Sequence, residues 1–291
     1  MKPAAFEYAR PSSLDEVLTI LAANAGDAKV LAGGQSLMPL LNYRMLRPAV
    51  LVDINRLTEL SFIREDGAGV RIGALTRHYS LETSPLIREH FPVIREAMKH
   101  VAHLAVRNRG SIGGSLSHAD PAAELPMLAM LLDARIHTRS ASEPRVHEAK
   151  DFFVAPLASV LKEDEVVTEI ELGDLQPGTG WGFEEFSRRS GDFAIAAVAA
   201  TLTLSADTVS SVRIALMGVD STPVRLWNLE SRLIGEILSE SLVTEAAQLA
   251  SEAVQPDTDL KASAQYRRHL VRTLTERALL SARDRARAAL Q

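Results

Sequence analysis

Two short segments, each with a pair of glycines beside a hydroxyl residue, carry the strongest chemical signal in this chain of 291 residues. Segment 32–36 reads Ala-Gly-Gly-Gln-Ser, and segment 111–115 reads Ser-Ile-Gly-Gly-Ser. Glycine tolerates positive φ and has no Cβ, so such loops let backbone N–H groups wrap a phosphate oxygen. Each loop alone could also be an ordinary tight turn. Because both precede an apolar helix-like run, the pair predicts a ligand with two adjacent anionic groups, such as a dinucleotide pyrophosphate.

Other chemical patterns in the sequence are weaker. Segment 67–73 is similar to a Rossmann fingerprint, but its last glycine comes one position late and two strand-like runs flank it, which favours a hairpin turn. The histidines lack the spacing of a metal site, although His100 and His103 could share a helix face. His118 follows Gly114 by four residues and could reach a bound cofactor. We predict no metal site and name no catalytic residue.

Composition excludes several classes of protein. Apolar residues make up 46% of the chain, enough for a full core, and the net charge of -5 argues against a dedicated nucleic-acid binder. The sequence contains no cysteine, which excludes disulfides, a catalytic thiol and cysteine-ligated iron–sulfur clusters. The first residues lack an apolar signal core, and no apolar run reaches membrane-spanning length. We therefore expect a cytoplasmic protein without a membrane span.

The elements around the first loop predict a small unit over residues 1–57. Ser13 and Glu16 have the spacing of a capping box, which predicts a helix that ends near Ala23. The strand-like runs are 29–32 and 50–54, and the helix-like run is 37–45. Together they predict a β-α-β-α-β-like unit in which the first strand delivers the first glycine loop.

The rest of the chain divides at a Pro- and Gly-containing stretch, 174–180, which is the best candidate for a linker. Before it we predict strands at 60–64, 69–75, 135–138 and 166–172, and helices at 79–101 and 122–132. After it we predict three antiparallel strands at 181–186, 194–204 and 211–219, and a last helix over 261–290. The domains expected are 1–57, 58–176 and 177–291.

The last helix is basic. Its arginines are Arg267, Arg268, Arg272, Arg277, Arg283, Arg285 and Arg287. Acidic residues are interleaved with them and no aromatic stripe accompanies them, so a solvated helix face is favoured over nucleic-acid binding. The alternative is a docking helix for an acidic partner.

The residues after the glycine loops carry a recognisable pattern. Segments 32–39 and 111–124 resemble the two flavin loops in the FAD-binding medium subunit of the molybdenum hydroxylases, the xanthine dehydrogenase and carbon monoxide dehydrogenase family. Segments 151–153, 165–170 and 188–194 resemble later parts of the same subunit, in the same order. The resemblance implies an α+β fold. It consists of a two-subdomain FAD-binding domain of the vanillyl-alcohol-oxidase-like (PCMH) type and a C-terminal domain with a three-stranded antiparallel sheet and helices.

The resemblance also implies a set of cofactor-binding residues. It places the pyrophosphate of a non-covalent FAD between the loops, Glu124 near the adenosine portion, a backbone contact at Val167, and Phe193 over the isoalloxazine. The full set is Val30, Leu31, Ala32, Gly33, Gly34, Gln35, Ser36, Leu37, Val101, Ser111, Ile112, Gly113, Gly114, Ser115, His118, Asp120, Glu124, Val167, Asp192 and Phe193. Two positions depart from the pattern. Glu184 replaces a lysine of xanthine dehydrogenase relatives, and Gln35 replaces a histidine found in some relatives.

The function that the resemblance implies is electron transfer within a larger complex. A small partner subunit would hold [2Fe-2S] clusters, a large partner subunit would hold the molybdenum cofactor, and FAD would pass electrons to an external acceptor. The complex expected is a dimer of heterotrimers, that is, a heterohexamer. Because this chain has no cysteine, it can bind neither cluster through thiolates. The alternatives are a stand-alone FAD-dependent oxidoreductase of the same fold and a non-enzymatic phospho-ligand-binding module.

Overall fold

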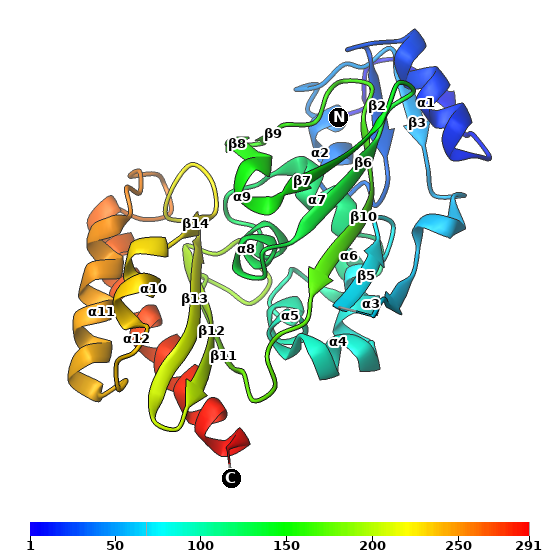
Figure 1. The fold of residues 1–291 in the computed structure, drawn as a ribbon. Coiled ribbons are helices and arrows are strands. Elements are labelled where there is room, and N and C mark those ends of the chain that lie inside the picture. The colour runs from blue at the N-terminus through cyan, green and yellow to red at the C-terminus, as the bar shows by residue number, and fades with distance from the viewer. Residues whose placement is uncertain (68, 291) are drawn as a thin grey trace.

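The computed structural model describes residues 1–67 and 69–290, which form three packed units. In Figure 1 the N-terminal unit (blue), the middle unit (cyan to green) and the C-terminal unit (yellow to red) follow one another across the molecule. Each unit has its own cluster of buried apolar side chains, although the middle cluster also includes residues of the C-terminal sheet.

The N-terminal unit is a three-stranded parallel sheet with the order β1-β3-β2. Its elements are β1 (Glu7–Ala9), α1 (Leu14–Ala23), β2 (Ala28–Leu31), α2 (Leu37–Asn42) and β3 (Val50–Asp53). The predicted cap is confirmed, since the Ser13 hydroxyl accepts from the Glu16 N–H, while the Glu16 carboxylate accepts from the N–H of Ser12. α2 ends three residues earlier than predicted, because Arg44 adopts a positive φ of 57° and the chain turns there.

The middle unit is built on a five-stranded antiparallel sheet with the order β4-β5-β10-β6-β7. Its strands are β4 (Ile63–Glu65), β5 (Gly69–Gly73), β6 (Arg135–Arg139), β7 (Pro144–Glu148) and β10 (Val166–Gly173), and a separate pair is β8 (Phe153–Ala155) with β9 (Ala158–Ser159). β4 and β5 form the predicted hairpin, although Ala68 in its turn lies outside the described residues. The hairpin excludes a Rossmann loop at this point. The predicted first strand begins later, because the 3-10 helix η1 (Thr58–Leu60) occupies its start.

Prolines divide the long helix predicted over 79–101. It consists of α3 (His78–Thr83), α4 (Pro85–His90) and α5 (Pro92–Met98), because proline cannot continue a preceding helix. His100 follows α5 and His103 is the N-cap of the next helix, so they do not share a helix face as predicted. The remaining helices of this unit are α6 (Leu104–Arg107), α7 (Ile112–His118), α8 (Glu124–Leu131) and α9 (Ala149–Phe152).

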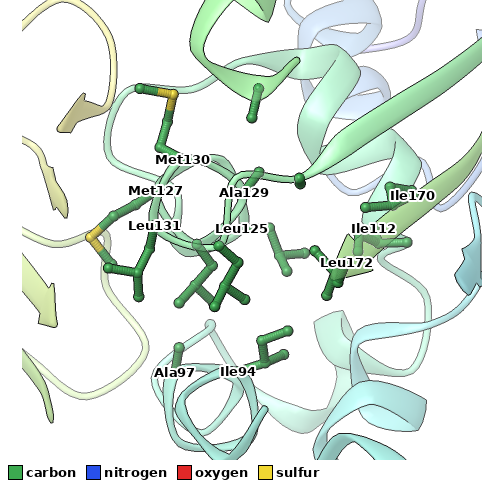
Figure 2. Packing of buried hydrophobic residues seen from close by; sticks show 14 of the residues in the cluster. Ile94, Ala97, Ile112, Leu125, Met127, Ala129, Met130, Leu131, Ile170 and Leu172 are labelled. Atoms are coloured by element: carbon green, nitrogen blue, oxygen red, sulfur yellow. The ribbon is translucent and has the colours of Figure 1, made fainter. Parts of the chain in front are cut away.

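Helix α8 runs through the largest core cluster. All its residues from 125 to 131 are buried, as the uniformly apolar sequence predicts. Figure 2 shows Leu125 and Leu131 above Ile94 and Ala97 of α5, with Ile112, Ile170 and Leu172 to one side. Met127 lies on the side of the helix that faces the C-terminal strands. This helix therefore joins the core of the middle unit to the C-terminal unit.

The C-terminal unit has a four-stranded antiparallel sheet, not the three strands predicted. Its order is β11 (Gly180–Phe186), β12 (Ala196–Ser205), β13 (Thr208–Met217) and β14 (Val224–Arg225), and its helices are α10 (Trp227–Leu233), α11 (Glu240–Ala253) and α12 (Ala264–Ala289). Periodicity cannot reveal the two-residue β14, which pairs with Ala215 and Leu216 of β13. α12 lies directly on the sheet, since a Cβ at Gly182 would be 2.1 Å from the Ala278 carbonyl oxygen.

The basic character of α12 has a partly structural origin. Arg267 is buried and donates to the carbonyls of Ile195 and Gly218 and to the Asp259 carboxylate.

No helix in the described part of the chain is both long and apolar enough to cross a membrane.

Candidate dinucleotide-binding site

The first glycine loop leaves strand β2 and offers free backbone donors. Within the described ranges, the N–H groups of residues 33–36 donate to no other residue. Gly34 has a φ of 72°, a conformation that L side chains rarely adopt. The Ser36 hydroxyl does not cap α2, so it too is available. This loop therefore has the free N–H groups and the hydroxyl that the sequence predicts.

The second glycine loop differs from that expectation, because most of its N–H groups already have partners. Ile112 donates to the Thr76 carbonyl and Gly113 to the Ala74 carbonyl, at 3.0 and 2.9 Å. Ser111 caps α7 and accepts from Gly114 and Ser115. A ligand can therefore approach the backbone closely at Gly114, which has no side chain, and can bind the hydroxyl of Ser115.

The two loops lie in contact although they belong to different units. A Cβ at Gly33 would lie 2.4 Å from the Arg109 carbonyl oxygen and 2.8 Å from the Cα of Gly110, just before the second loop. A Cβ at Gly114 would lie 3.9 Å from the Cβ of Ala32. Glycine is therefore needed at position 33 for this close approach.

A hollow of about 380 Å³ opens beside the first loop. It is lined by residues 31–35 together with Met38, Pro39, Asp53, Asn55 and Arg109. All five of these additional residues lie outside the predicted set, although Met38 and Pro39 belong to the segment that resembles the first flavin loop. A signal for Asp53 and Asn55 existed, because they lie at the carboxyl end of β3, beside β2, where ligands of parallel sheets gather.

The hollow combines an ionised carboxylate with a basic group. Burial acts to raise the pKa of Asp53, but hydrogen bonds from Tyr8 and from Asn55 outweigh it and hold this pKa below its usual range. Arg109 is exposed and forms no ion pair with a carboxylate of the described residues. Its guanidinium is therefore available to an anion.

Other predicted residues lie near the loops without lining the hollow. Val30 precedes Leu31 in β2, and Leu37 begins α2. Val167 is buried in β10, beside an irregularity that leaves the Thr168 carbonyl to accept from the Ala74 N–H. His118 lies one turn beyond Gly114 on the same face of α7, and burial lowers its pKa.

A second group of predicted residues lies where the C-terminal unit meets the middle unit. The loop that carries Asp192 and Phe193 packs on the segment that follows Val101, since a Cβ at Gly191 would lie 2.5 Å from the His103 ring. The Phe193 ring is 57% exposed, with the Lys261 amine 5.3 Å from its centre. Phe193 is thus a surface aromatic and not part of the core.

The carboxyl groups of Glu124 and Glu185 lie near each other at the same junction. Asp120 accepts from the Ala122 N–H just before α8, where Glu124 begins the helix. Burial, and then the charge of Glu185, raises the pKa of Glu124 to about 8. Burial raises the pKa of Glu185 in β11 to about 7, and its Oε2 atom has no hydrogen-bond partner among the described residues. Glu124 is therefore largely protonated at neutral pH, and Glu185 is about half protonated.

The neighbouring Glu184 has different surroundings. The opposite charges that act on it come from Arg277 and Arg285 of α12, while burial raises its pKa. Successive residues of a strand alternate between faces, so Glu184 and Glu185 point to opposite sides of β11, and it is the charge of Glu185 that acts on Glu124. Position 184, where xanthine dehydrogenase relatives have a lysine, therefore lies near two arginines that supply positive charge.

This fold and these loops identify the class of protein. The family profile described as "FAD binding domain in molybdopterin dehydrogenase" matches residues 4–173, and the profile "CO dehydrogenase flavoprotein C-terminal domain" matches residues 181–282. The chain belongs to this family, the FAD-binding medium subunits of the molybdenum hydroxylases.

Individual relatives match along nearly their full length. The chain is 43% identical to 6-hydroxypseudooxynicotine dehydrogenase complex subunit alpha of Paenarthrobacter nicotinovorans, covering 99% of this chain and 97% of that protein. It is 38% identical to the carbon monoxide dehydrogenase medium chain of Hydrogenophaga pseudoflava, covering 97% and 98%. Carbon monoxide dehydrogenase from that organism, without the Mo-pyranopterin moiety, superposes with a TM-score of 0.96 at 38% identity over 98% of this chain and 99% of that one. Quinoline 2-oxidoreductase from Pseudomonas putida 86 superposes with a TM-score of 0.94 at 36% identity over both full chains.

The residues of this site fit FAD. A pyrophosphate needs donors and close backbone approach, and the first loop supplies free N–H groups while Gly114 leaves space where a Cβ would fill it. The hydroxyls of Ser36 and Ser115 and the guanidinium of Arg109 add donors of the right chemistry.

Proposed function

We propose that the chain binds one FAD without a covalent bond, with its pyrophosphate between segments 32–36 and 111–115. The observation that carries this proposal is the contact of the two glycine loops, one of which has free N–H donors. Neither segment contains a histidine or cysteine to which a flavin could be attached. Within this proposal the FAD-binding domain has the vanillyl-alcohol-oxidase-like arrangement, with subdomains 1–57 and 58–176 and a C-terminal domain over 177–291.

The chain's own residues bind, orient and shield in this proposal. FAD supplies the redox chemistry, in which two electrons are accepted and passed on. The N–H groups of residues 33–36 hold the phosphates, and Val30 and Leu31 line the flavin side. Phe193 covers the isoalloxazine from the exposed loop of the C-terminal unit, which also carries Asp192 and packs on the segment that follows Val101. Glu124 holds its proton at neutral pH and Glu185 is about half protonated, so the pair adds less negative charge to the junction than two ionised carboxylates would.

We further propose that electrons reach this site from partner subunits. Relatives are named as a medium chain or as a subunit of a complex, and this sequence has no cysteine for a cluster. The [2Fe-2S] clusters then belong to a small subunit and the molybdenum cofactor to a large one. The whole assembles as a dimer of heterotrimers, in which this chain delivers electrons to an external acceptor.

Substitution of Gly33 tests the site directly. In Gly33→Ala the new Cβ would meet the Arg109 carbonyl at 2.4 Å, so the loops must separate and bound flavin is lost. We expect the purified wild-type chain to release one FAD per chain on heat denaturation, and the variant to release less than about a tenth of that. Gly173→Ala is the matched control, because nothing lies within 4 Å of its added Cβ. Full flavin occupancy in Gly33→Ala would reject the two-loop site.

A further inference from the structure

The side chain of Asn55, which lines the hollow, holds the start of the first glycine loop by a hydrogen bond. Its Nδ2 atom donates to the Ala32 carbonyl at 2.8 Å and to Asp53 Oδ1 at 2.7 Å. A trans peptide is planar with its C=O and N–H in opposite directions. Fixing the Ala32 carbonyl on Asn55 therefore turns the Gly33 N–H away from Asn55. In this way a side chain outside the loop sets the direction of one of its free donors.

Arg77 extends this contact to the second loop. One terminal nitrogen donates to Asn55 Oδ1 at 2.6 Å, and the other donates to the Arg109 carbonyl at 2.5 Å. The Arg109 carbonyl is also the atom against which Gly33 packs. A continuous chain of hydrogen bonds thus runs from Ala32 through Asn55 and Arg77 to Arg109.

This chain of bonds joins two units of the molecule at the point where the glycine loops meet. Asn55 follows β3 of the N-terminal unit, whereas Arg77 is the N-cap of α3 in the middle unit. The two carbonyls that they hold lie on either side of the contact between the loops. Burial, together with the nearby charge of Arg109, lowers the pKa of Arg77, and the Asp53 carboxylate opposes this effect.

We propose that Asn55 and Arg77 form a strap that sets the separation and the orientation of the two glycine loops before a dinucleotide binds. Both are positioning residues, because they act through the Ala32 and Arg109 carbonyls. The inference rests on the proposed FAD site and adds the means by which that site is preorganised. Preorganised donors bind a ligand more tightly because less ordering is required at binding.

Two variants test the strap. Asn55→Leu has a side chain of similar size that neither donates to the Ala32 carbonyl nor accepts from Arg77, and it adds no charge to the hollow that Asn55 lines. Arg77→Lys keeps the charge, but a single amine does not reproduce the fork that reaches both Asn55 Oδ1 and the Arg109 carbonyl. Arg64→Lys is the matched control, since Arg64 is 59% exposed and its side chain pairs with Glu169 on the middle sheet.

The measurement is the dissociation constant of FAD, and separately of ADP, for the full chain freed of flavin. We expect each strap variant to bind both ligands about tenfold more weakly, because ADP carries the pyrophosphate without the flavin. The double variant is expected to be little weaker than either single variant, because one chain of bonds is broken in each case. Thermal unfolding of the flavin-free chains, with the variants near the wild type, separates loop positioning from loss of the fold.

The outcomes distinguish this inference from the proposed function. If folded Asn55→Leu and Arg77→Lys bind FAD and ADP as tightly as Arg64→Lys does, the strap is rejected while the FAD site stands. The strap is also rejected if the losses of binding free energy in the two single variants add up in the double variant. If the wild-type chain binds neither ligand, the proposed site itself fails.

Discussion

At the scale of single residues, the site depends on backbone atoms more than on side chains. The first loop presents N–H groups at residues 33–36, and the second presents the bare surface of Gly114 with the Ser115 hydroxyl. Side chains that approach a ligand come from neighbouring elements, as Arg109 does. This arrangement suits an electron-transfer site, where the cofactor provides the chemistry and the protein provides position and electrostatics.

Phe193 provides a residue-scale test of how the flavin is shielded. Because its ring is 57% exposed, we expect Phe193→Ala to change the free energy of unfolding by less than about 0.5 kcal/mol. If the ring covers the isoalloxazine, the variant with FAD bound will show altered flavin fluorescence and faster reoxidation by oxygen. Stopped-flow mixing of the reduced protein with oxygenated buffer measures this rate. Tyr43→Ala is the control, since Tyr43 is also exposed, at 68%, and lies outside the predicted set. Identical spectra and rates in wild type and Phe193→Ala would contradict the shielding role.

At the scale of elements, α8 joins the middle unit to the C-terminal unit. The Gly218 N–H donates to the Pro121 carbonyl just before this helix, and Arg225 donates to the Met130 carbonyl near its end. The C-terminal unit therefore holds α8 at both ends, while α5 packs below it (Figure 2). Glu124 at its start and Glu185 in β11 are partly buried at the same junction, so the stability of the junction depends on their protonation.

We predict that this junction weakens as the pH rises. Both carboxyls have folded pKa values above their ordinary 4.5, at about 8 for Glu124 and about 7 for Glu185. Their favourable contribution is complete below pH 4.5 and is lost as the pH passes through about 7 to 8, because the unfolded chain ionises them first. For Glu185 the loss is at most about 3 kcal/mol. Urea unfolding measured at acid and at alkaline pH will show that the free energy of unfolding falls less with rising pH in Glu185→Gln than in wild type. The exposed Glu236→Gln is expected to lose as much stability as wild type, and an equal loss in Glu185→Gln would refute the assignment.

The sequence predicts the elements that follow strong periodicity and misses those decided by distant partners. α1, β3, α8 and the three long C-terminal strands agree with their predicted segments within a few residues. β14 and β7 were missed, because one has two residues and the other alternates polar residues at a sheet edge. Both glycine loops were recognised from local composition. Asn55 and Arg77 were not, because their importance arises from hydrogen bonds between segments 22 residues or more apart.

At the scale of the whole molecule, the chain has the parts of a flavin domain and lacks the parts that would make it a complete hydroxylase. It contains no cysteine. In the described part of the chain no group of histidines and carboxylates is placed to hold a metal ion. These findings agree with the proposal that electrons reach the site from partner subunits.

The chain alone is accordingly expected to be incompetent in the reaction of its complex. Purified with FAD, it will show at most slow diaphorase activity with artificial electron donors and no turnover of an organic hydroxylase substrate. Expressed together with a large molybdopterin subunit and a small [2Fe-2S] subunit of its complex, it is expected to elute with the mass of a dimer of heterotrimers. Size-exclusion chromatography with light scattering, and metal analysis of the peak, check this assembly. Rapid hydroxylation of a substrate by this polypeptide alone, free of molybdenum and iron, would instead establish a stand-alone flavoenzyme.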